Sequence, residues 1–126
     1  MTQTVTPIIP PGLEFPETMS LSALQEHMAR MCAHYGWDKS RDEQTFLLFV
    51  EEVGELAKAI RKVNHLFEEQ SNPAKPVLDD TARQQNLAEE FGDVLSYLFE
   101  LASRFGVDLQ QAYKDKLLDA MQREWK

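Results

Sequence analysis

The chain has only one cysteine, Cys32, among its 126 residues. It can form no internal disulfide, and with no CxxC or CxxH pattern around it we expect a buried structural thiol rather than a metal ligand or nucleophile. The sequence also contains no apolar run of 18 residues and no signal-peptide pattern, so we expect neither a membrane span nor secretion. Together these absences predict a protein of the reducing cytoplasm.

Proline is scarce outside two short stretches. Four of the six prolines lie within the first 19 residues, and the other two, Pro73 and Pro76, lie close together near the middle of the chain. Because proline interrupts helices, this distribution predicts a proline-rich N-terminal tail over residues 1–19, a loop at about 71–80, and otherwise helix in one domain over residues 20–126. A chain of this length can build one core, but self-association would bury more apolar surface.

Positive charge is also limited, because 13 lysines and arginines stand against 21 aspartates and glutamates. Nucleic-acid polymers and anionic membranes bind through basic patches, so neither is an expected partner. An anionic substrate would need metal ions to bind to this chain.

The apolar residues recur at helical spacing and predict four helices with no strand, which is the all-α class and the architecture of a four-helix bundle. The expected helices run from Ser20 or Ser22 to Tyr35, over 42–69, over 81–104 and from 108 onward. Gly36 and Gly106 are expected to end the first and third helices, and Asp108 with Gln111 to open the fourth as a capping box. The expected inward-facing residues, helix by helix, are Leu21, Leu24, Met28, Met31 and Tyr35; Phe46, Val53, Leu56, Ile60 and Phe67; Leu87, Phe91, Val94, Leu98 and Phe105; and Leu109, Ala112, Tyr113, Leu117, Ala120 and Met121.

An acidic motif occurs twice, because the segment VEEVGEL returns 38 residues later as AEEFGDV. On a helix, a spacing of three residues places Glu52 beside Glu55 and Glu90 beside Asp93, and each pair has the same angular position relative to the apolar stripe of its helix. If the two stripes pack together, the four carboxylates converge and repel one another unless a divalent cation binds there. All-carboxylate ligation suits Mg²⁺, with Mn²⁺ as the other candidate.

A solvated helix face is the alternative explanation for one such pair, because a sixth of the chain is acidic. The repetition in the same phase, without lysine or arginine four residues after these acids, favours the metal site. Redox iron is disfavoured, because none of His27, His34 and His65 stands three residues after a glutamate. Each of these histidines is expected at the surface or at a helix cap.

Gly54 and Gly92 each stand in the middle of an expected helix, where glycine costs about 1 kcal/mol relative to alanine. Both lie off the apolar stripe. Unless the helices merely tolerate them, another helix or a neighbouring subunit is expected to approach closely at these positions.

The residues Glu51-Glu52-Val53-Gly54-Glu55 and Glu90-Phe91-Gly92-Asp93 give the chain its clearest resemblance. In them it resembles the MazG-like all-α nucleoside triphosphate pyrophosphohydrolases, whose signature is E-E-x-x-E followed by E-x-x-D. Further residues look like the small dCTP-pyrophosphatase-like branch, namely Gly36-Trp37-Asp38, Tyr97, and Val107-Asp108-Leu109 leading to Lys116. The resemblance covers roughly residues 21–116.

The resemblance implies Mg²⁺-dependent hydrolysis of a (deoxy)nucleoside triphosphate to the monophosphate and pyrophosphate, a house-cleaning reaction of the nucleotide pool, by a homodimer or homotetramer. It implies that the metal is held by Glu52, Glu55, Glu90 and Asp93, with Glu51 as an outer-sphere or water-orienting group and Glu89 as a second candidate for that role. Under the same resemblance Trp37 and Tyr97 either contact the base or are core aromatics, and Lys116 is either a phosphate contact or a solvated lysine.

The chain departs from the pattern at one position, since many relatives have asparagine where Ala120 stands, and this leaves phosphate or sugar contacts from the fourth helix open. The loop at 71–80 is the expected cover of the base pocket. Two other functions remain as alternatives. One is a dUTPase-like or phosphoribosyl-ATP pyrophosphohydrolase-like activity, and the other is a helical module that binds a nucleotide or a protein partner without catalysis.

Overall fold

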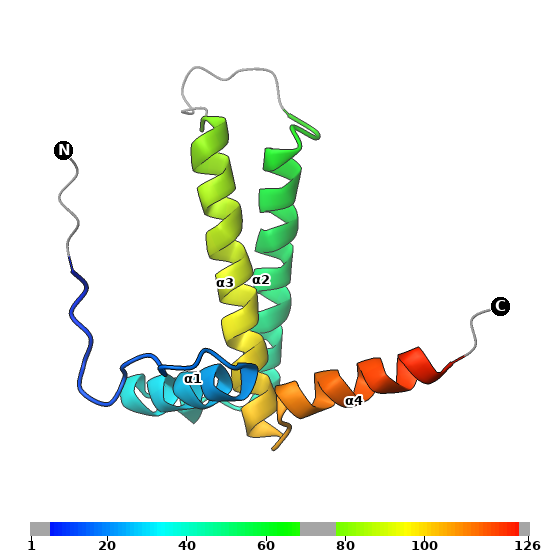
Figure 1. Ribbon diagram of the computed structural model, residues 1–126. Coiled ribbons are helices and arrows are strands. Elements are labelled where there is room, and N and C mark those ends of the chain that lie inside the picture. The colour runs from blue at the N-terminus through cyan, green and yellow to red at the C-terminus, as the bar shows by residue number, and fades with distance from the viewer. Residues whose placement is uncertain (1–5, 69–77, 124–126) are drawn as a thin grey trace. The chain divides into compact units, whose positions relative to one another are not determined.

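A computed structural model describes residues 6–68 and 78–123 of the chain. Over these residues the chain is helical and contains no strand (Figure 1). The elements are α1 (Leu21–Tyr35), the 3₁₀ helix η1 (Trp37–Lys39), α2 (Asp42–Val63), α3 (Asp80–Arg104) and α4 (Leu109–Gln122). The predicted all-α class with four helices is therefore confirmed. The part of the predicted loop that holds Pro73 and Pro76, and the predicted helix end at Glu69, lie outside the described residues.

Four helix ends follow the signals in the sequence. The Ser20 hydroxyl accepts a backbone hydrogen bond from the first turn of α1 (3.1 Å), so Ser20 rather than Ser22 is the cap. Gly36 and Gly106 have left-handed φ angles of 75° and 67° just after α1 and α3. Asp108 accepts backbone hydrogen bonds from the first turn of α4. The capping box itself is only half formed, because the Gln111 amide donates to Asp115 instead (2.8 Å).

The end of α2 was predicted too late. The helix stops at Val63 because His65 takes a left-handed conformation (φ 53°), and the amides of His65 and Leu66 bond back to the carbonyls of Lys62 and Arg61. This is the Schellman arrangement that usually carries glycine at the left-handed position. With histidine at this position, the helix end carries no stop signal that can be recognised in the sequence. The position does agree with the expectation that His65 lies at a helix cap.

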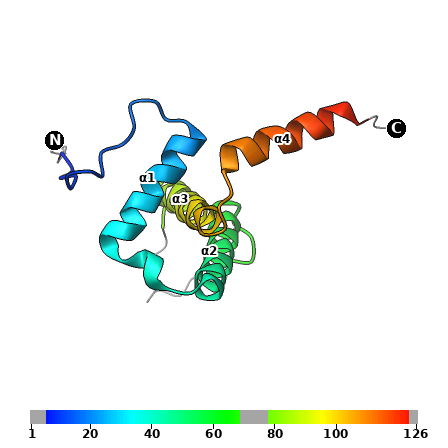
Figure 2. The same cartoon turned by 90° about the horizontal axis from the view of Figure 1, so that it is seen from below.

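The chain divides into two compact units, which we describe separately. One comprises Met1–Lys39 and Ala102–Lys126, and the other comprises Ser40–Leu101. In the second unit α2 and α3 run side by side in opposite directions, as both views show (Figures 1 and 2). The buried or half-buried side of α2 carries Thr45, Glu52 and Ala59, which are seven residues apart and so share one side of the helix.

The predicted apolar stripes are therefore only partly buried. More than half of the predicted inward-facing residues are exposed, namely Tyr35, Phe46, Val53, Ile60, Phe67, Phe91, Leu98, Phe105, Ala112, Tyr113, Leu117 and Met121. The physical reason is that the buried side of α2, with Thr45, Glu52 and Ala59 beside the half-buried Phe49 and Leu56, is rotated from the centre of the apolar stripe. Much of the apolar stripe is left on the surface of the single chain.

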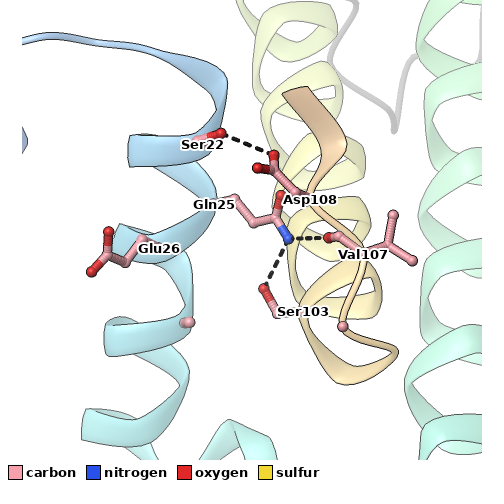
Figure 3. Close-up of a pocket in the computed structure, with 8 residues that line it drawn as sticks. Ser22, Gln25, Glu26, Ser103, Val107 and Asp108 are labelled. Carbon is pink, nitrogen blue, oxygen red and sulfur yellow. Dashed lines mark hydrogen bonds between the residues drawn. The ribbon is translucent and has the colours of Figure 1, made fainter. Parts of the chain in front are cut away.

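In the first unit, α1 joins the start of α4 through a polar junction around Gln25, which is only 8% exposed. The Gln25 amide donates to the Val107 carbonyl (2.7 Å) and the Ser103 hydroxyl (3.3 Å), and its oxygen accepts from the Leu109 amide (2.9 Å). The Ser22 hydroxyl donates to Asp108 (2.9 Å) beside it (Figure 3). Because the polar groups around this shallow pocket of about 370 Å³ bond one another, we regard it as a packing junction rather than a substrate site.

We expect Gln25→Ala to destabilise the fold by about 2–3 kcal/mol, because it leaves the Leu109 amide and the Val107 carbonyl without their partner. Urea unfolding followed by circular dichroism would measure the loss. Gln111→Ala removes only an exposed side-chain bond and serves as the control. Equal stabilities of the two variants would contradict the role given to Gln25.

The N-terminal segment lies against α1 through His27, which is buried rather than at the surface or at a cap as predicted. Its Nε2 bonds the carbonyl oxygen of Leu13 (2.8 Å), and its ring stacks on Phe15 with 4.7 Å between centroids. Leu13 itself is buried. The predictions for two neighbouring residues of α1 are confirmed, because Cys32 is buried and His34 is exposed.

In the second unit, Arg83 links the beginning of α3 to the C-terminal end of α2 and the turn that follows it. Its guanidinium donates to the Lys62 carbonyl (2.5 Å) and to the Glu68 carboxylate, and it bonds His65 Nδ1 (3.1 Å). The His65 ring also contacts Asp80 (3.0 Å) at the start of α3. Hydrogen bonds first from Arg83 and then from His65 lower the pKa of Glu68 below its ordinary value.

A group whose pKa is lowered on folding stabilises the fold above its unfolded pKa, and that stabilisation is lost as the pH falls through the lowered value. Glu68→Gln should therefore melt at a lower temperature than the wild type at pH 7, and the gap should close as the pH falls below about 4.5. Thermal melts at pH 7 and pH 3, with Glu26→Gln as a surface control, would measure it. A gap that stayed the same at both pH values would contradict the ion-pair explanation.

Candidate functional site

Three of the predicted acids come together between α2 and α3. One carboxylate oxygen from each of Glu52, Glu90 and Asp93 lies within 4.8 Å of the others. Glu52 comes from the half-buried side of α2, while Glu90 and Asp93 are one turn apart on α3. The spacing of three residues places Glu90 and Asp93 together on α3, as predicted. The pairing of α2 with α3 adds Glu52 as the third acid.

The surroundings of this cluster disfavour a full set of negative charges. Burial, followed by the charges of Asp93 and Glu90, raises the pKa of Glu52 above its ordinary value. Glu90 Oε2 is buried and accepts no hydrogen bond from the described residues. A buried carboxylate oxygen without a donor is costly unless a cation contacts it. The three residues are therefore a group that could hold a metal ion, and oxygen ligands of this kind suit a hard divalent cation.

The other acids of the motif lie around this group. Glu55 is exposed and lies outside the group of three within the described part of the chain, although its charge helps to raise the pKa of Glu52. Its assignment as a ligand remains a prediction. Glu51 and Glu89 are exposed on α2 and α3, and their water-orienting role is likewise a prediction.

Tyr97 lies one turn after Asp93 on α3 and is half-buried. Burial, followed by the charges of Glu52, Glu100 and Asp93, raises the pKa of its hydroxyl above its ordinary value. The phenol therefore stays protonated and can donate a hydrogen bond. Glu100 is itself buried, at 7% exposure. The sequence did not single it out, although a glutamate within the apolar segment SYLFELA was the available signal.

Trp37 and Lys116 belong to the other unit, and we describe them there. Trp37 begins η1, is 47% exposed, and stacks on Tyr35 with 4.9 Å between centroids and 21° between planes. Its carbonyl accepts a hydrogen bond from Arg104 (3.3 Å). Lys116 is exposed on α4. Of the two explanations offered for Trp37, the exposure argues against a core aromatic.

A family model for the MazG nucleotide pyrophosphohydrolase domain matches residues 41–123. This is more than half of the chain, so the chain belongs to this family. The matched region contains both acidic motifs, Tyr97 and Lys116, whereas Trp37 lies before it. A search of curated proteins found no match. Within 6–68 and 78–123, no helix combines the length and apolarity needed to span a membrane.

Proposed function

We propose that this chain hydrolyses a (deoxy)nucleoside triphosphate to the monophosphate and pyrophosphate, with Mg²⁺ at the acidic cluster. The observation that supports this most is the approach of Glu52, Glu90 and Asp93 within 4.8 Å, with Glu90 Oε2 buried beside them. A member of a nucleotide pyrophosphohydrolase family with such a group has the donor set that the reaction needs. Mn²⁺ is the expected substitute.

The acidic residues of the chain have two roles in the proposed reaction, which are metal binding and orientation of water. Glu52, Glu90 and Asp93, together with Glu55, hold the metal. When bound, the metal neutralises their charge, polarises a water molecule and offsets charge on the reacting phosphate. Glu51 orients the attacking water. That water adds to phosphorus and breaks the anhydride bond between the α- and β-phosphates, so that pyrophosphate leaves.

The remaining candidates contact the substrate outside the metal. Trp37 stacks on the base, since its ring is half-exposed and aromatic rings bind bases of any sequence. Tyr97 offers a protonated hydroxyl or its ring to the same nucleotide. Lys116 pairs with a phosphate.

A panel of nucleotides, each assayed for pyrophosphate release with Mg²⁺, tests the function and ranks the alternatives. The proposal predicts turnover of at least one deoxynucleoside triphosphate. Selective turnover of dUTP or of phosphoribosyl-ATP would assign one of the other superfamily activities. If the chain bound a nucleotide but hydrolysed none of the panel, it would be a nucleotide-binding module, and the proposal would be refuted.

We also propose that the chain acts as a homodimer or homotetramer. The support is the apolar stripe left exposed on α2 and α3, which includes Phe46, Val53, Ile60, Phe91 and Leu98. A Cβ atom added at Gly54 or Gly92 would meet nothing within 4 Å in the single chain. A close approach at these glycines would therefore have to come from another subunit.

We expect Trp37→Ala to raise KM about tenfold or more and to change kcat less, because stacking is worth about 1–3 kcal/mol per base and acts away from the reacting phosphorus. Steady-state kinetics would measure both constants.

Nucleotide binding should also quench the fluorescence of Trp37. Trp125, which lies outside the described residues, is the control. A quench that survived Trp37→Phe and disappeared in Trp125→Phe would contradict the assignment.

A further inference from the structure

The turn after α1 carries an aromatic stack that the sequence did not predict. Tyr35 was expected to face inward, but it is 49% exposed. It stacks on Trp37 across Gly36, with 4.9 Å between ring centroids, and His34 meets the edge of its ring at 4.7 Å. The Tyr35 ring therefore lies between those of His34 and Trp37 in a row of three aromatic contacts.

The backbone explains why the two larger rings meet. Gly36 has a φ of 75°, and its amide bonds back to the Cys32 carbonyl. This left-handed step ends the helix and redirects the chain, and the rings of Tyr35 and Trp37 stack on either side of the glycine. The Trp37 carbonyl is held in turn by Arg104 (3.3 Å). Arg104 therefore holds the backbone of Trp37, and Tyr35 stacks on its ring.

We propose that Tyr35 is a positioning residue that holds the Trp37 ring ready to stack on the nucleotide base. The inference rests on the proposed function, in which Trp37 contacts the base. Tyr35 covers one face of the indole, so a base must stack on the other. A half-exposed tryptophan without this support would sample several rotamers, and ordering it on binding would cost affinity. Stacked aromatic pairs are strong enough to suppress that sampling.

The experiment compares Tyr35→Ala, Tyr35→Leu and Tyr35→Phe, all made in a Trp125→Phe background so that Trp37 is the single tryptophan. The substrate is whichever of dATP, dCTP, dGTP, dTTP and dUTP has the highest kcat/KM. Inorganic tripolyphosphate, tested as a competitive inhibitor, is the probe without a base. Thermal melts confirm that each variant is folded. The substitutions should be tolerated because the Tyr35 side chain is exposed.

We expect Tyr35→Ala and Tyr35→Leu to raise KM about three- to tenfold with kcat within about twofold, and Tyr35→Phe to behave like the parent. The inhibition constant of tripolyphosphate should not change, because it has no base. In the absence of nucleotide, the two variants that lack an aromatic ring at position 35 should also show altered Trp37 emission.

Three outcomes would overturn the inference and are distinguishable from one another. If Trp37→Ala raises KM but Tyr35→Ala does not, Tyr35 does not position the ring, and the proposed function stands. If Trp37→Ala leaves KM unchanged, the base contact itself is wrong, and the role of Tyr35 fails with it. A rise in the inhibition constant of tripolyphosphate in Tyr35→Ala would point to general damage of the site and would also refute positioning.

Discussion

Asp93→Asn should lose at least about 100-fold in kcat/KM for nucleotide hydrolysis, because it removes one of three carboxylates that converge on the proposed metal. The substitution keeps the shape of the side chain and removes its charge. Without Mg²⁺ the variant should be at least as thermally stable as the wild type, since repulsion with Glu52 and Glu90 is relieved. Adding Mg²⁺ should raise the melting temperature of the wild type and have little effect on the variant.

Pyrophosphate release and thermal melts with and without Mg²⁺ would measure these effects. Glu43→Gln, which removes an exposed carboxylate in the first turn of α2, is the matched control and should keep full activity. Full activity of Asp93→Asn would refute the site. A variant that is inactive but much less stable without Mg²⁺ would instead assign Asp93 to the fold.

Ile60→Glu should convert the proposed oligomer to monomers at micromolar concentration. Ile60 is 40% exposed on the apolar stripe of α2, so the single chain tolerates a polar side chain there. In a subunit interface the same carboxylate would be desolvated without a partner, which should weaken association by at least about 100-fold. Light scattering coupled to size-exclusion chromatography would measure the change.

Lys58→Glu is the control for charge, because two residues along a helix correspond to about 200° and place Lys58 on the opposite side of α2. It should leave the assembly intact. A wild-type chain that remained monomeric at high concentration would refute the oligomer. Dissociation by Lys58→Glu but not by Ile60→Glu would show that the interface lies on the side of α2 opposite the apolar stripe, and would contradict the proposed interface.

The helix boundaries were predictable where a single residue determines the end. Ser20 and Asp108 cap their helices through their own side chains, and Gly36 and Gly106 take the left-handed conformation that glycine favours. The end of α2 was not predictable, because histidine at position 65 adopts the same conformation without such a preference. Its stabilisation comes from Arg83 and Asp80, which lie far along the chain.

The packing was less predictable than the helices. Periodicity identifies an apolar side of a helix, but it does not tell whether that side meets a helix of the same chain or another molecule. Phe46 and Phe91 are both exposed at 54%, while the small residues Thr45 and Ala59 are buried. The spacing did place Glu90 and Asp93 together. That Glu52 joins them while Glu55 stays outside depends on the register of α2 against α3, which the sequence does not encode locally.

The most direct test of the central claim is to follow the phosphorus products of nucleotide hydrolysis by ³¹P NMR, with Mg²⁺ and with excess EDTA. Metal at the cluster of Glu52, Glu90 and Asp93 predicts a nucleoside monophosphate and pyrophosphate in equal amounts with Mg²⁺, and no products with EDTA. A nucleoside diphosphate with inorganic phosphate, or equal turnover in EDTA, would contradict it.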